Sequence, residues 1–172
     1  MMVHQLAREG GTDVLAAVEA ALTEAEVRAV SVADAPTVSA VDALRAARAS
    51  GRRVAVVSNN SAECVLAYLP TQGLSDAVEV VVGRPALRPD LMKPSPHALL
   101  EAAAILGMAP DRTALVGDSV SDIEAARAGT ARSIGYANKP GKTEALAVAG
   151  ADAVIAGMGA LARALTARPG GR

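Results

Sequence analysis

Residues 113–122 read Thr-Ala-Leu-Val-Gly-Asp-Ser-Val-Ser-Asp, and this stretch decides the fold. A short apolar run ends at Gly117 and is followed by the polar residue Asp118 and by a helical pattern over 121–128. An apolar run of this length beside a glycine predicts a buried strand, and Asp122 then falls in the first turn of the next helix. Strand, polar turn and helix in this order are typical of one unit of a parallel sheet.

The same alternation continues through the chain from about residue 51 onward. We expect strands over 54–57, 77–82, 113–117, 131–136 and 153–155, and helices over 61–69, 94–106, 121–128, 142–149 and 158–167. Strands that alternate with helices form a parallel sheet covered on both faces. The predicted fold class is therefore α/β, a Rossmann-like parallel sheet with helices on both faces.

The first 50 residues follow a different pattern. Residues 12–32 are rich in alanine and predict helix, and Thr23 with Glu26 forms a capping-box pattern that predicts a second helix start inside this stretch. A further helix is expected over 38–49. We therefore divide the chain into a partial helical cap segment over 1–37, a Rossmann-like core over 38–167 and a frayed tail over 168–172.

The composition excludes several kinds of partner. The 172 residues carry 17 basic and 18 acidic side chains without a block of like charge, which argues against a nucleic acid or an anionic membrane as partner. Phe and Trp are absent, so base-stacking platforms are not expected. No apolar run approaches the roughly 18 residues that span a membrane. With the single cysteine Cys64 and no signal-peptide pattern, a cytoplasmic location is the expectation.

Polar residues from three separate segments follow or approach the ends of predicted strands. Ser58 and Asn59 come directly after the strand over 54–57, and a hydroxyl beside free backbone N–H groups suits an anion. Lys93 precedes a helix, where its charge opposes the helix dipole and calls for an anionic partner. Asp118 and Asp122 converge at a strand end, and two such carboxylates suit Mg²⁺. Because ligands bind at the carboxyl ends of parallel strands, we expect these groups to share one site.

Each of these residues also has an ordinary structural explanation. Ser58 could serve only as a helix N-cap, and Lys93 could be an exposed loop lysine. Asp118 and Asp122 could simply complement the dipole of the helix that follows them. Their order along the chain, each beside the appropriate element, favours the common site.

Three further features have ordinary structural explanations. Arg84 and Arg88 are expected to be solvated loop charges rather than an anion site. Asn138 and Lys139 are expected to form a loop surface, with substrate contact as the alternative. Cys64 is expected to be a small core residue of its helix.

A family resemblance rests on these motifs. The strand followed by Ser58-Asn59, the pair Lys93-Pro94 and the run Gly117-Asp-Ser-Val-Ser-Asp122 resemble motifs two, three and four of the haloacid dehalogenase (HAD) superfamily. The resemblance is to the phosphoglycolate-phosphatase-like branch, and it covers about residues 38–165. Most members of the superfamily are Mg²⁺-dependent phosphatases, so it implies hydrolysis of a small phosphorylated metabolite.

The resemblance also implies a role for each motif residue. Ser58 would bind the transferring phosphoryl group beside the Asn59 amide, and Lys93 would neutralise phosphate and nucleophile charge. Asp118 would ligate Mg²⁺, and Asp122 would hold either the water shell of the metal or Lys93. Such roles agree with phosphoryl transfer, which depends mainly on positioning and charge neutralisation.

One departure from the family pattern concerns the nucleophile. The family's first motif is a strand followed by Asp-x-Asp, and the only aspartates before Ser58 are Asp13, Asp34 and Asp42. None has a second aspartate two residues later, and Asp34, which follows an apolar run, has the wrong spacing to Thr37. We therefore expect that the chain begins downstream of its catalytic strand and shows no turnover as written.

Two functions remain open at this point, together with a weaker third. The first is a HAD-like phosphohydrolase whose first motif is supplied from elsewhere, and the second is a non-catalytic pseudoenzyme or phosphate-binding module. The third is a receiver-like domain, which would need an early acidic pair that this chain lacks.

The absent strand also has a structural consequence. In the family it lies between the strands that end at Ser58 and at Gly117, and unpaired buried backbone groups cost about 1–3 kcal/mol each. For an ordered monomer we expect these two strands to close onto each other or residues 27–32 to fill the position. Filling by another chain, or poor folding, is the third possibility.

Overall fold

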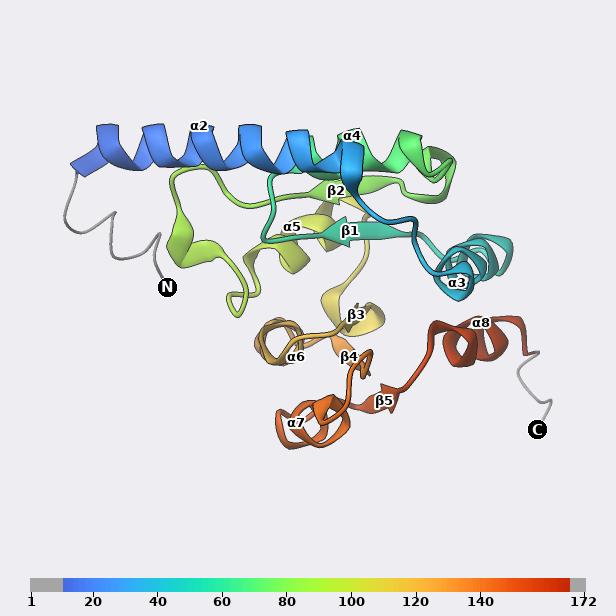
Figure 1. Cartoon of the computed structure of the whole chain (residues 1–172). Helices are drawn as coiled ribbons and strands as arrows, with labels where there is room; N and C mark the ends of the chain where they lie inside the picture. Colours follow the sequence, from blue (N-terminus) through green and yellow to red (C-terminus); the bar gives the residue numbers. More distant parts are fainter. Residues whose placement is uncertain (1–10, 168–172) are drawn as a thin grey trace.

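A computed structural model describes residues 11–167 of the chain (Figure 1). Its α-helices are α2 (Gly11–Ala29), α3 (Val38–Ala49), α4 (Ala62–Thr71), α5 (His97–Ile105), α6 (Val120–Ala128), α7 (Lys142–Val148) and α8 (Met158–Thr166). The 3₁₀ helices are η1 (Val30–Val32), η2 (Ser75–Ala77), η3 (Pro89–Leu91) and η4 (Pro110–Arg112). The strands are β1 (Ala55–Val57), β2 (Val80–Val82), β3 (Ala114–Gly117), β4 (Arg132–Tyr136) and β5 (Ala153–Ile155). Within residues 11–167, no helix combines the length and the apolar character needed to cross a bilayer.

All strand pairs are parallel, which confirms the predicted α/β class. β1 pairs with β2, and β3, β4 and β5 form a second ladder in that order. Below, "the two-stranded half" means β1 and β2 with α2, α4 and α5, and "the three-stranded half" means β3 to β5 with α6 and α7. Helices α3 and α8 lie side by side and join the two halves (Figure 1).

The first helix differs from the prediction. Residues 11–29 form one uninterrupted helix, so the second start expected at Thr23 is wrong. The two residues of the capping-box pattern have tertiary partners instead, because Thr23 Oγ1 and both carboxylate oxygens of Glu26 accept hydrogen bonds from Arg84. A local capping pattern is thus overridden by a buried cation from the core. The predicted cap segment is described only from Gly11, and the tail 168–172 lies outside the described residues.

Most other boundaries agree with the sequence within one or two residues, with two exceptions. The helix expected from residue 94 begins at His97, because Pro96 keeps the preceding Ser95 out of helical geometry. The strand expected over 77–82 is shorter, since Ser75–Ala77 forms a 3₁₀ turn and the strand begins at Val80.

Two apolar clusters place the core between the strands and the helices α5 and α6. Val82 packs with Ala98 and Ala102 of α5, and Ala55, Val57 and Val80 pack against this cluster. The second cluster contains Leu99, Leu115, Ala125, Ala126 and Ala131, and Val57 packs against it as well. Because Leu115 belongs to β3 and Val57 to β1, side chains of the two halves are joined although their backbones are not.

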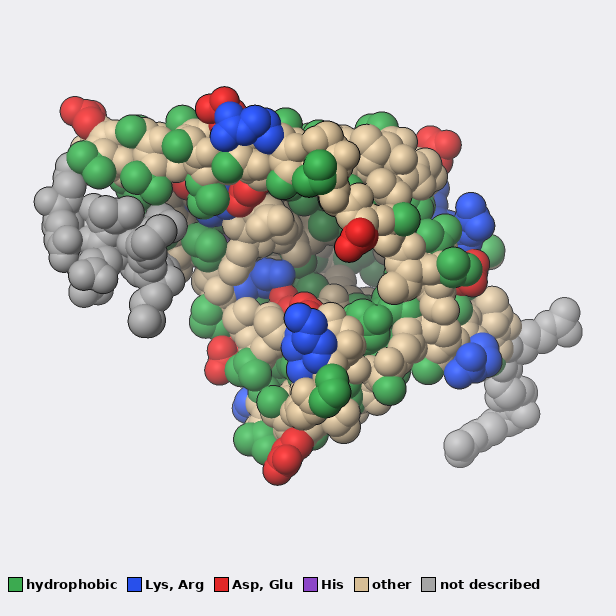
Figure 2. All heavy atoms as spheres, in the orientation of Figure 1, with side chains coloured by type: hydrophobic (Ala, Val, Ile, Leu, Met, Phe, Trp, Pro, Cys, Tyr) green, Lys and Arg blue, Asp and Glu red, His purple; other side chains and the backbone are tan. Residues whose placement is uncertain are grey.

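The ladder is interrupted between β1 and β3, and we call this position the strand slot. β1 and β3 do not pair in residues 11–167, and residues 27–32 are helical rather than extended. The expected closure and the expected insertion of residues 27–32 are therefore both wrong. Tertiary contacts explain the outcome: α2 is held along its length by Arg84, and the α3–α8 pair spans the two halves. Figure 2 shows the surface hollowed between the two halves.

Hydrogen-bond alternation shows which backbone groups face the slot. Ser58 N–H donates to Val82 O, so Ala55 and Val57, of opposite parity, face away from β2. In the same way, Arg132 N–H donates to Thr113 O, which turns the N–H and C=O groups of Ala114 and Val116 away from β4. The N–H and C=O groups of Ala55 and Val57 on β1, and of Ala114 and Val116 on β3, are therefore turned away from the ladders to which these strands belong.

Candidate active site

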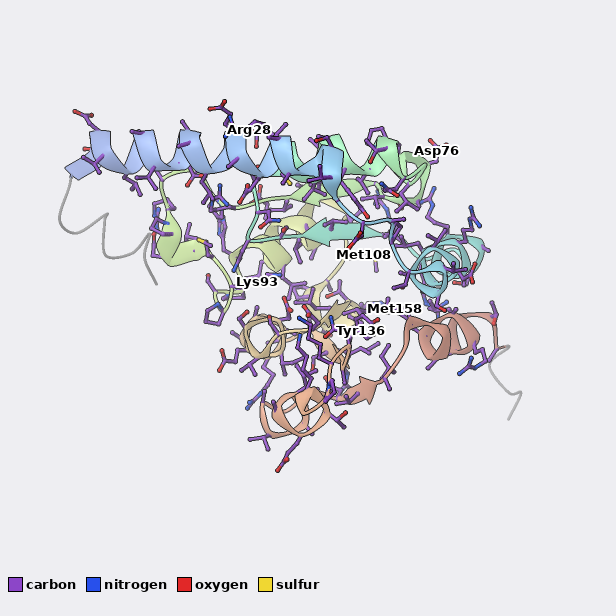
Figure 3. The ribbon with its side chains drawn as sticks, viewed as in Figure 1. Arg28, Asp76, Lys93, Met108, Tyr136 and Met158 are labelled. Atoms are coloured by element: carbon purple, nitrogen blue, oxygen red, sulfur yellow. The ribbon has the colours of Figure 1, made fainter. Side chains whose placement is uncertain are left out.

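Lys93 lies where the two halves meet, at the carboxyl end of β1. Its ammonium donates to Asp122 Oδ1 at 2.6 Å and to the Val57 carbonyl at 3.3 Å. The Lys93 side chain is 15% exposed and that of Asp122 is 7% exposed. Lys93 was expected within reach of Asp118 or Asp122, and the contact with Asp122 confirms this; Figure 3 shows Lys93 between β1 and α6.

Asp122 is held from both sides. It forms a capping box with Ser119 at the start of α6: Ser119 N–H and Oγ donate to Asp122 Oδ2, and Asp122 N–H donates back to Ser119 Oγ. Gly117 makes room for it, because a Cβ at that position would lie 2.3 Å from Asp122 Cγ. With Oδ2 bound to Ser119 and Oδ1 bound to Lys93, Asp122 is placed to orient Lys93.

The turn after β1 brings Ser58 and Asn59 to the same edge. Ser58 Oγ accepts from Asn60 N–H at 3.0 Å, a local turn contact, while Ser61 is the N-cap of α4. Asn59 uses its side chain to hold the lysine loop: Oδ1 accepts from Lys93 N–H at 2.9 Å and Nδ2 donates to Lys93 O at 3.3 Å. Ser58 is therefore not a helix cap, and it follows directly after Val57, whose carbonyl accepts from Lys93.

Asp118 has partners that the sequence did not predict. Lys142 Nζ donates to Asp118 Oδ2 at 2.5 Å and to Asp118 O at 2.8 Å, and Asn138 Nδ2 donates to the same Oδ2 at 3.0 Å. The hydrogen bond from Lys142 lowers the pKa of Asp118 below its usual value. Lys142 begins α7, so its charge opposes the helix dipole, as the sequence predicted for Lys93 before α5 was found to begin only at His97. The reasoning applied to Lys93 would have found Lys142 too.

The carboxylates were tested for their fit to Mg²⁺. Among residues 11–167, no group of three or more His, Cys, Asp or Glu side chains could hold a metal ion. Asp122 has both oxygens engaged, and Asp118 offers only Oδ1 in the described part of the chain. One carboxylate oxygen falls short of a metal site, although Mg²⁺ often keeps waters and takes oxygen from phosphates. The described residues alone do not fit the ion, and no chemical step is assigned to it.

The remaining sequence candidates have varied outcomes. Asp34 lies in an exposed loop between η1 and α3, and its carbonyl accepts from the Tyr68 hydroxyl. Arg88 is an exposed loop charge paired with Asp90, as expected. Arg84 is not: its side chain is 2% exposed and bound to two glutamates. Cys64 is half-buried, and burial raises the pKa of its thiol.

Comparison with known proteins decides the family. Residues 3–130 match the family profile described as haloacid dehalogenase-like hydrolase. This chain belongs to the haloacid dehalogenase-like hydrolases. The structure adds the geometry of motifs two to four, with the ion pair between Lys93 and Asp122 at its centre.

Several relatives of this HAD-like chain are named phosphoglycolate phosphatases. That of Nitrosococcus oceani is 40% identical over 81 residues, which is 47% of this chain and 35% of the relative. The phosphoglycolate phosphatase, plasmid, of Cupriavidus necator is 37% identical over 127 residues, covering 72% of this chain and 52% of the relative. The chain thus spans roughly a third to a half of the length of these two relatives.

Solved HAD structures share the arrangement. A HAD family hydrolase from Deinococcus radiodurans, solved with bound phosphate and sodium, matches with a TM-score of 0.68 and 27% identity over 95% of this chain and 73% of its own. A conserved haloacid dehalogenase-like protein of unknown function from Agrobacterium tumefaciens matches with a TM-score of 0.67 at 27% identity, over 95% of this chain and 75% of its own.

Proposed function

We propose that this chain provides the phosphate-binding part of a phosphomonoester hydrolase of the phosphoglycolate-phosphatase-like branch. The observation that carries the proposal is the ion pair of Lys93 with Asp122 at the carboxyl end of β1, 2.6 Å long and largely buried. Support comes from relatives named phosphoglycolate phosphatase and from a structural neighbour solved with phosphate. The substrate class is a small phosphorylated metabolite, without nucleic acid or membrane as partner.

Each residue has a proposed task in binding phosphate. Ser58 Oγ and the Asn59 N–H donate to the phosphoryl oxygens, and Lys93 neutralises part of their charge. Asp122 keeps the ammonium of Lys93 in place and limits the places it can reach. Asp118 Oδ1 would contribute to Mg²⁺ binding once further oxygen ligands are present, and such an ion would supply charge neutralisation.

The nucleophile of such a hydrolase is not among the aspartates before Ser58. Asp13 is in the first turn of α2 and Asp42 is on α3, both far along the chain from a strand end. Asp34 is exposed in a loop. Covalent phosphoryl transfer to a carboxylate needs that carboxylate positioned beside the phosphate. We therefore propose that the chain as written has no turnover.

The strand slot indicates how the nucleophile would arrive. A strand parallel to β1 and β3 would pair with the N–H and C=O groups of Ala55, Val57, Ala114 and Val116. Its carboxyl end would lie next to Lys93 Nζ, which donates to the slot-facing carbonyl of Val57. A carboxylate at that end would meet the Lys93 ammonium. We propose that the slot takes an extended segment that ends in the family's Asp-x-Asp.

The experiment adds this segment to the chain. An apolar strand ending in Asp-x-Asp, joined ahead of residue 1 by a flexible linker, is compared with the same strand ending in Asn-x-Asn. Phosphate release from 2-phosphoglycolate with Mg²⁺ is expected only for Asp-x-Asp, while both extensions raise the melting temperature. Turnover by the unextended chain that is lost in Asp34→Asn would contradict the proposal.

The second candidate is a non-catalytic phosphate-binding module, favoured by the same lack of a positioned nucleophile. It is chosen if the chain binds inorganic phosphate, if Lys93→Met abolishes this binding, and if neither extension produces turnover.

A further inference from the structure

Arg84 is the most completely buried cation for which the structure gives an ion pair among residues 11–167, at 2% side-chain exposure. Its Nε donates to Glu19 Oε1 at 2.7 Å, and Nη1 donates to Glu26 Oε1 at 2.7 Å. Burial alone would lower the pKa of Arg84, but the hydrogen bonds to Glu26 and Glu19 raise it. Two carboxylates of α2 balance the guanidinium, so Arg84 has no free charge for a phosphate.

The same side chain contacts the turn after β1. Arg84 Nη1 donates to Asn59 O at 2.9 Å, and Arg84 N–H donates to Asn60 O at 2.7 Å. Ser61 follows Asn60 in the chain, and its N–H donates to Glu26 Oε2 at 2.8 Å. Three consecutive residues of the turn, 59 to 61, are therefore fixed by Arg84 or by its glutamate partner.

The turn after β1 also holds Lys93 in place. The Asn59 side chain accepts from Lys93 N–H and donates to Lys93 O, so both backbone groups of the lysine depend on where Asn59 stands. Gly83 shows how closely these loops fit, since a Cβ there would lie 2.1 Å from Ala62 N. The contacts run without a break from α2 through Arg84 and Asn59 to Lys93.

We propose that Arg84 is a positioning residue for Lys93, and that α2 acts as a brace behind the phosphate loop. Glu19 and Glu26 hold the guanidinium, the guanidinium holds the Asn59 backbone, and the Asn59 side chain holds Lys93. The assignment rests on the proposed function for its relevance to phosphate, but the coupling to Lys93 is a property of the fold.

The lysine content gives a direct probe. The chain contains three lysines, Lys93, Lys139 and Lys142, so ¹³C-lysine labelling yields one set of side-chain NMR signals for each. In Arg84→Met the Lys93 ε-CH₂ signal is expected to shift, while those of Lys139 and Lys142 stay in place. The matched control is Arg28→Met, which removes an exposed ion pair between Arg28 and Glu24 of α2. This variant should move none of the three lysine signals.

A triple variant separates positioning from stability. Arg84→Met leaves two carboxylates of α2 without their partner, and this loss is itself destabilising. R84M/E19Q/E26Q removes those charges, so its melting temperature is expected to recover most of the loss while its Lys93 signal stays displaced. If Arg84 acted on stability alone, the triple variant would recover both the melting temperature and the wild-type position of the Lys93 signal. Arg84→Lys keeps a charge but not the forked donors, and we expect the Lys93 signal to shift there too.

Inorganic phosphate separates this inference from the proposed function. Addition of phosphate is expected to move the Lys93 signal of the unaltered chain. In the triple variant the dissociation constant for phosphate should be higher by about threefold or more. If phosphate leaves the unaltered Lys93 signal unmoved, the proposed function fails, and the Arg84 comparison still decides the coupling. If the folded triple variant and Arg84→Lys both keep the wild-type Lys93 signal, Arg84 is not a positioning residue.

Discussion

Two similar lysine–carboxylate pairs lie in different surroundings, one across the junction of the two halves and one within the three-stranded half. In the pair that joins the halves, Lys93 and Asp122 are 15% and 7% exposed. Within the three-stranded half, Lys142 and Asp118 are 29% and 48% exposed. Each lysine precedes or begins a helix, yet only the first pair is shut off from water. The buried pair sets geometry across the strand slot, and the exposed pair fastens a loop to a strand end.

This difference teaches which contact the fold depends on. A buried ion pair that loses one partner leaves a charge in a poorly solvated place, whereas an exposed pair contributes little. Removing the lysine of each pair should therefore lower the free energy of unfolding by unequal amounts, and this difference can be measured.

The largest difference is expected for the two lysines. Lys93→Met should lower the free energy of unfolding by about 3 kcal/mol, because Asp122 keeps its Ser119 hydrogen bonds but loses its counter-ion. Lys142→Met should cost about 0.5–1 kcal/mol. Urea unfolding followed by circular dichroism measures both. The double variant K93M/D122N should be more stable than Lys93→Met, and equal losses for the two lysines would break the comparison.

Close-approach glycines supply the second pair. A Cβ at Gly83 would meet the Ala62 backbone at 2.1 Å, and a Cβ at Gly117 would meet the Asp122 side chain at 2.3 Å. Backbone yields less than a side chain, so Gly83→Ala should cost about 3 kcal/mol and Gly117→Ala about 2 kcal/mol.

Gly157→Ala is the control for these glycines, because nothing lies within 4 Å of its added Cβ and its φ of −160° suits any residue. Its melting temperature should stay near that of the unaltered chain. A smaller loss for Gly83→Ala than for Gly157→Ala would show that the turn after β1 packs less tightly than described.

The same contrast explains what the sequence could predict. Periodicity and turn residues identified every strand of the structure and the separate segments that carry Ser58, Lys93 and Asp122, because those signals are local. Lys93 and Asp122 are 29 positions apart, and the contact was predicted only through a family motif. Within the three-stranded half the strand ranges agreed closely, with β5 matched at both ends.

The larger misses involve partners distant in sequence. The Thr23 pattern predicted a helix start because its local partner Glu26 fits a capping box, but Arg84, 58 residues beyond Glu26, takes that carboxylate. In the sequence Arg84 looks like a loop charge, because its burial depends on Glu19 and Glu26 of α2, which are far from it along the chain. The cost of unpaired backbone groups predicted that the strand slot would close. It could not predict the open slot, because α3 and α8 span the two halves without pairing β1 with β3.

Helix caps give a third and smaller contrast. Ser119 and Asp122 cap each other reciprocally at the start of α6, whereas the Ser61 hydroxyl caps α4 by accepting from Cys64 N–H. Ser119→Ala should cost about 1.5 kcal/mol and Ser61→Ala about 0.5–1 kcal/mol. Thermal unfolding is the measurement, and Ser119→Thr, which keeps the hydroxyl, should recover part of the loss. A Ser61 cost above that of Ser119 would reverse the ranking of the two caps.

The smallest expected effect is the dependence on pH, which also differs between the halves. Burial opposes the charge of Glu26, but hydrogen bonds from Arg84 and Ser61 lower its pKa, and the hydrogen bond from Lys142 lowers that of Asp118. A carboxylate with a lowered pKa in the folded state stabilises the fold above its ordinary pKa of about 4, and this contribution is lost as pH falls through the folded-state value. The free energy of unfolding should therefore fall as pH drops from about 5 to 3. Lys142→Met should remove the Asp118 part of the slope, Lys139→Met should leave it intact, and Glu26→Gln should remove the buried Glu26 part. Because the Asp118 side chain is 48% exposed, salt should weaken its part more than that of Glu26, which is 14% exposed. An equal response of both parts to salt would show that the Arg84 cluster is as open to water as the Lys142 pair.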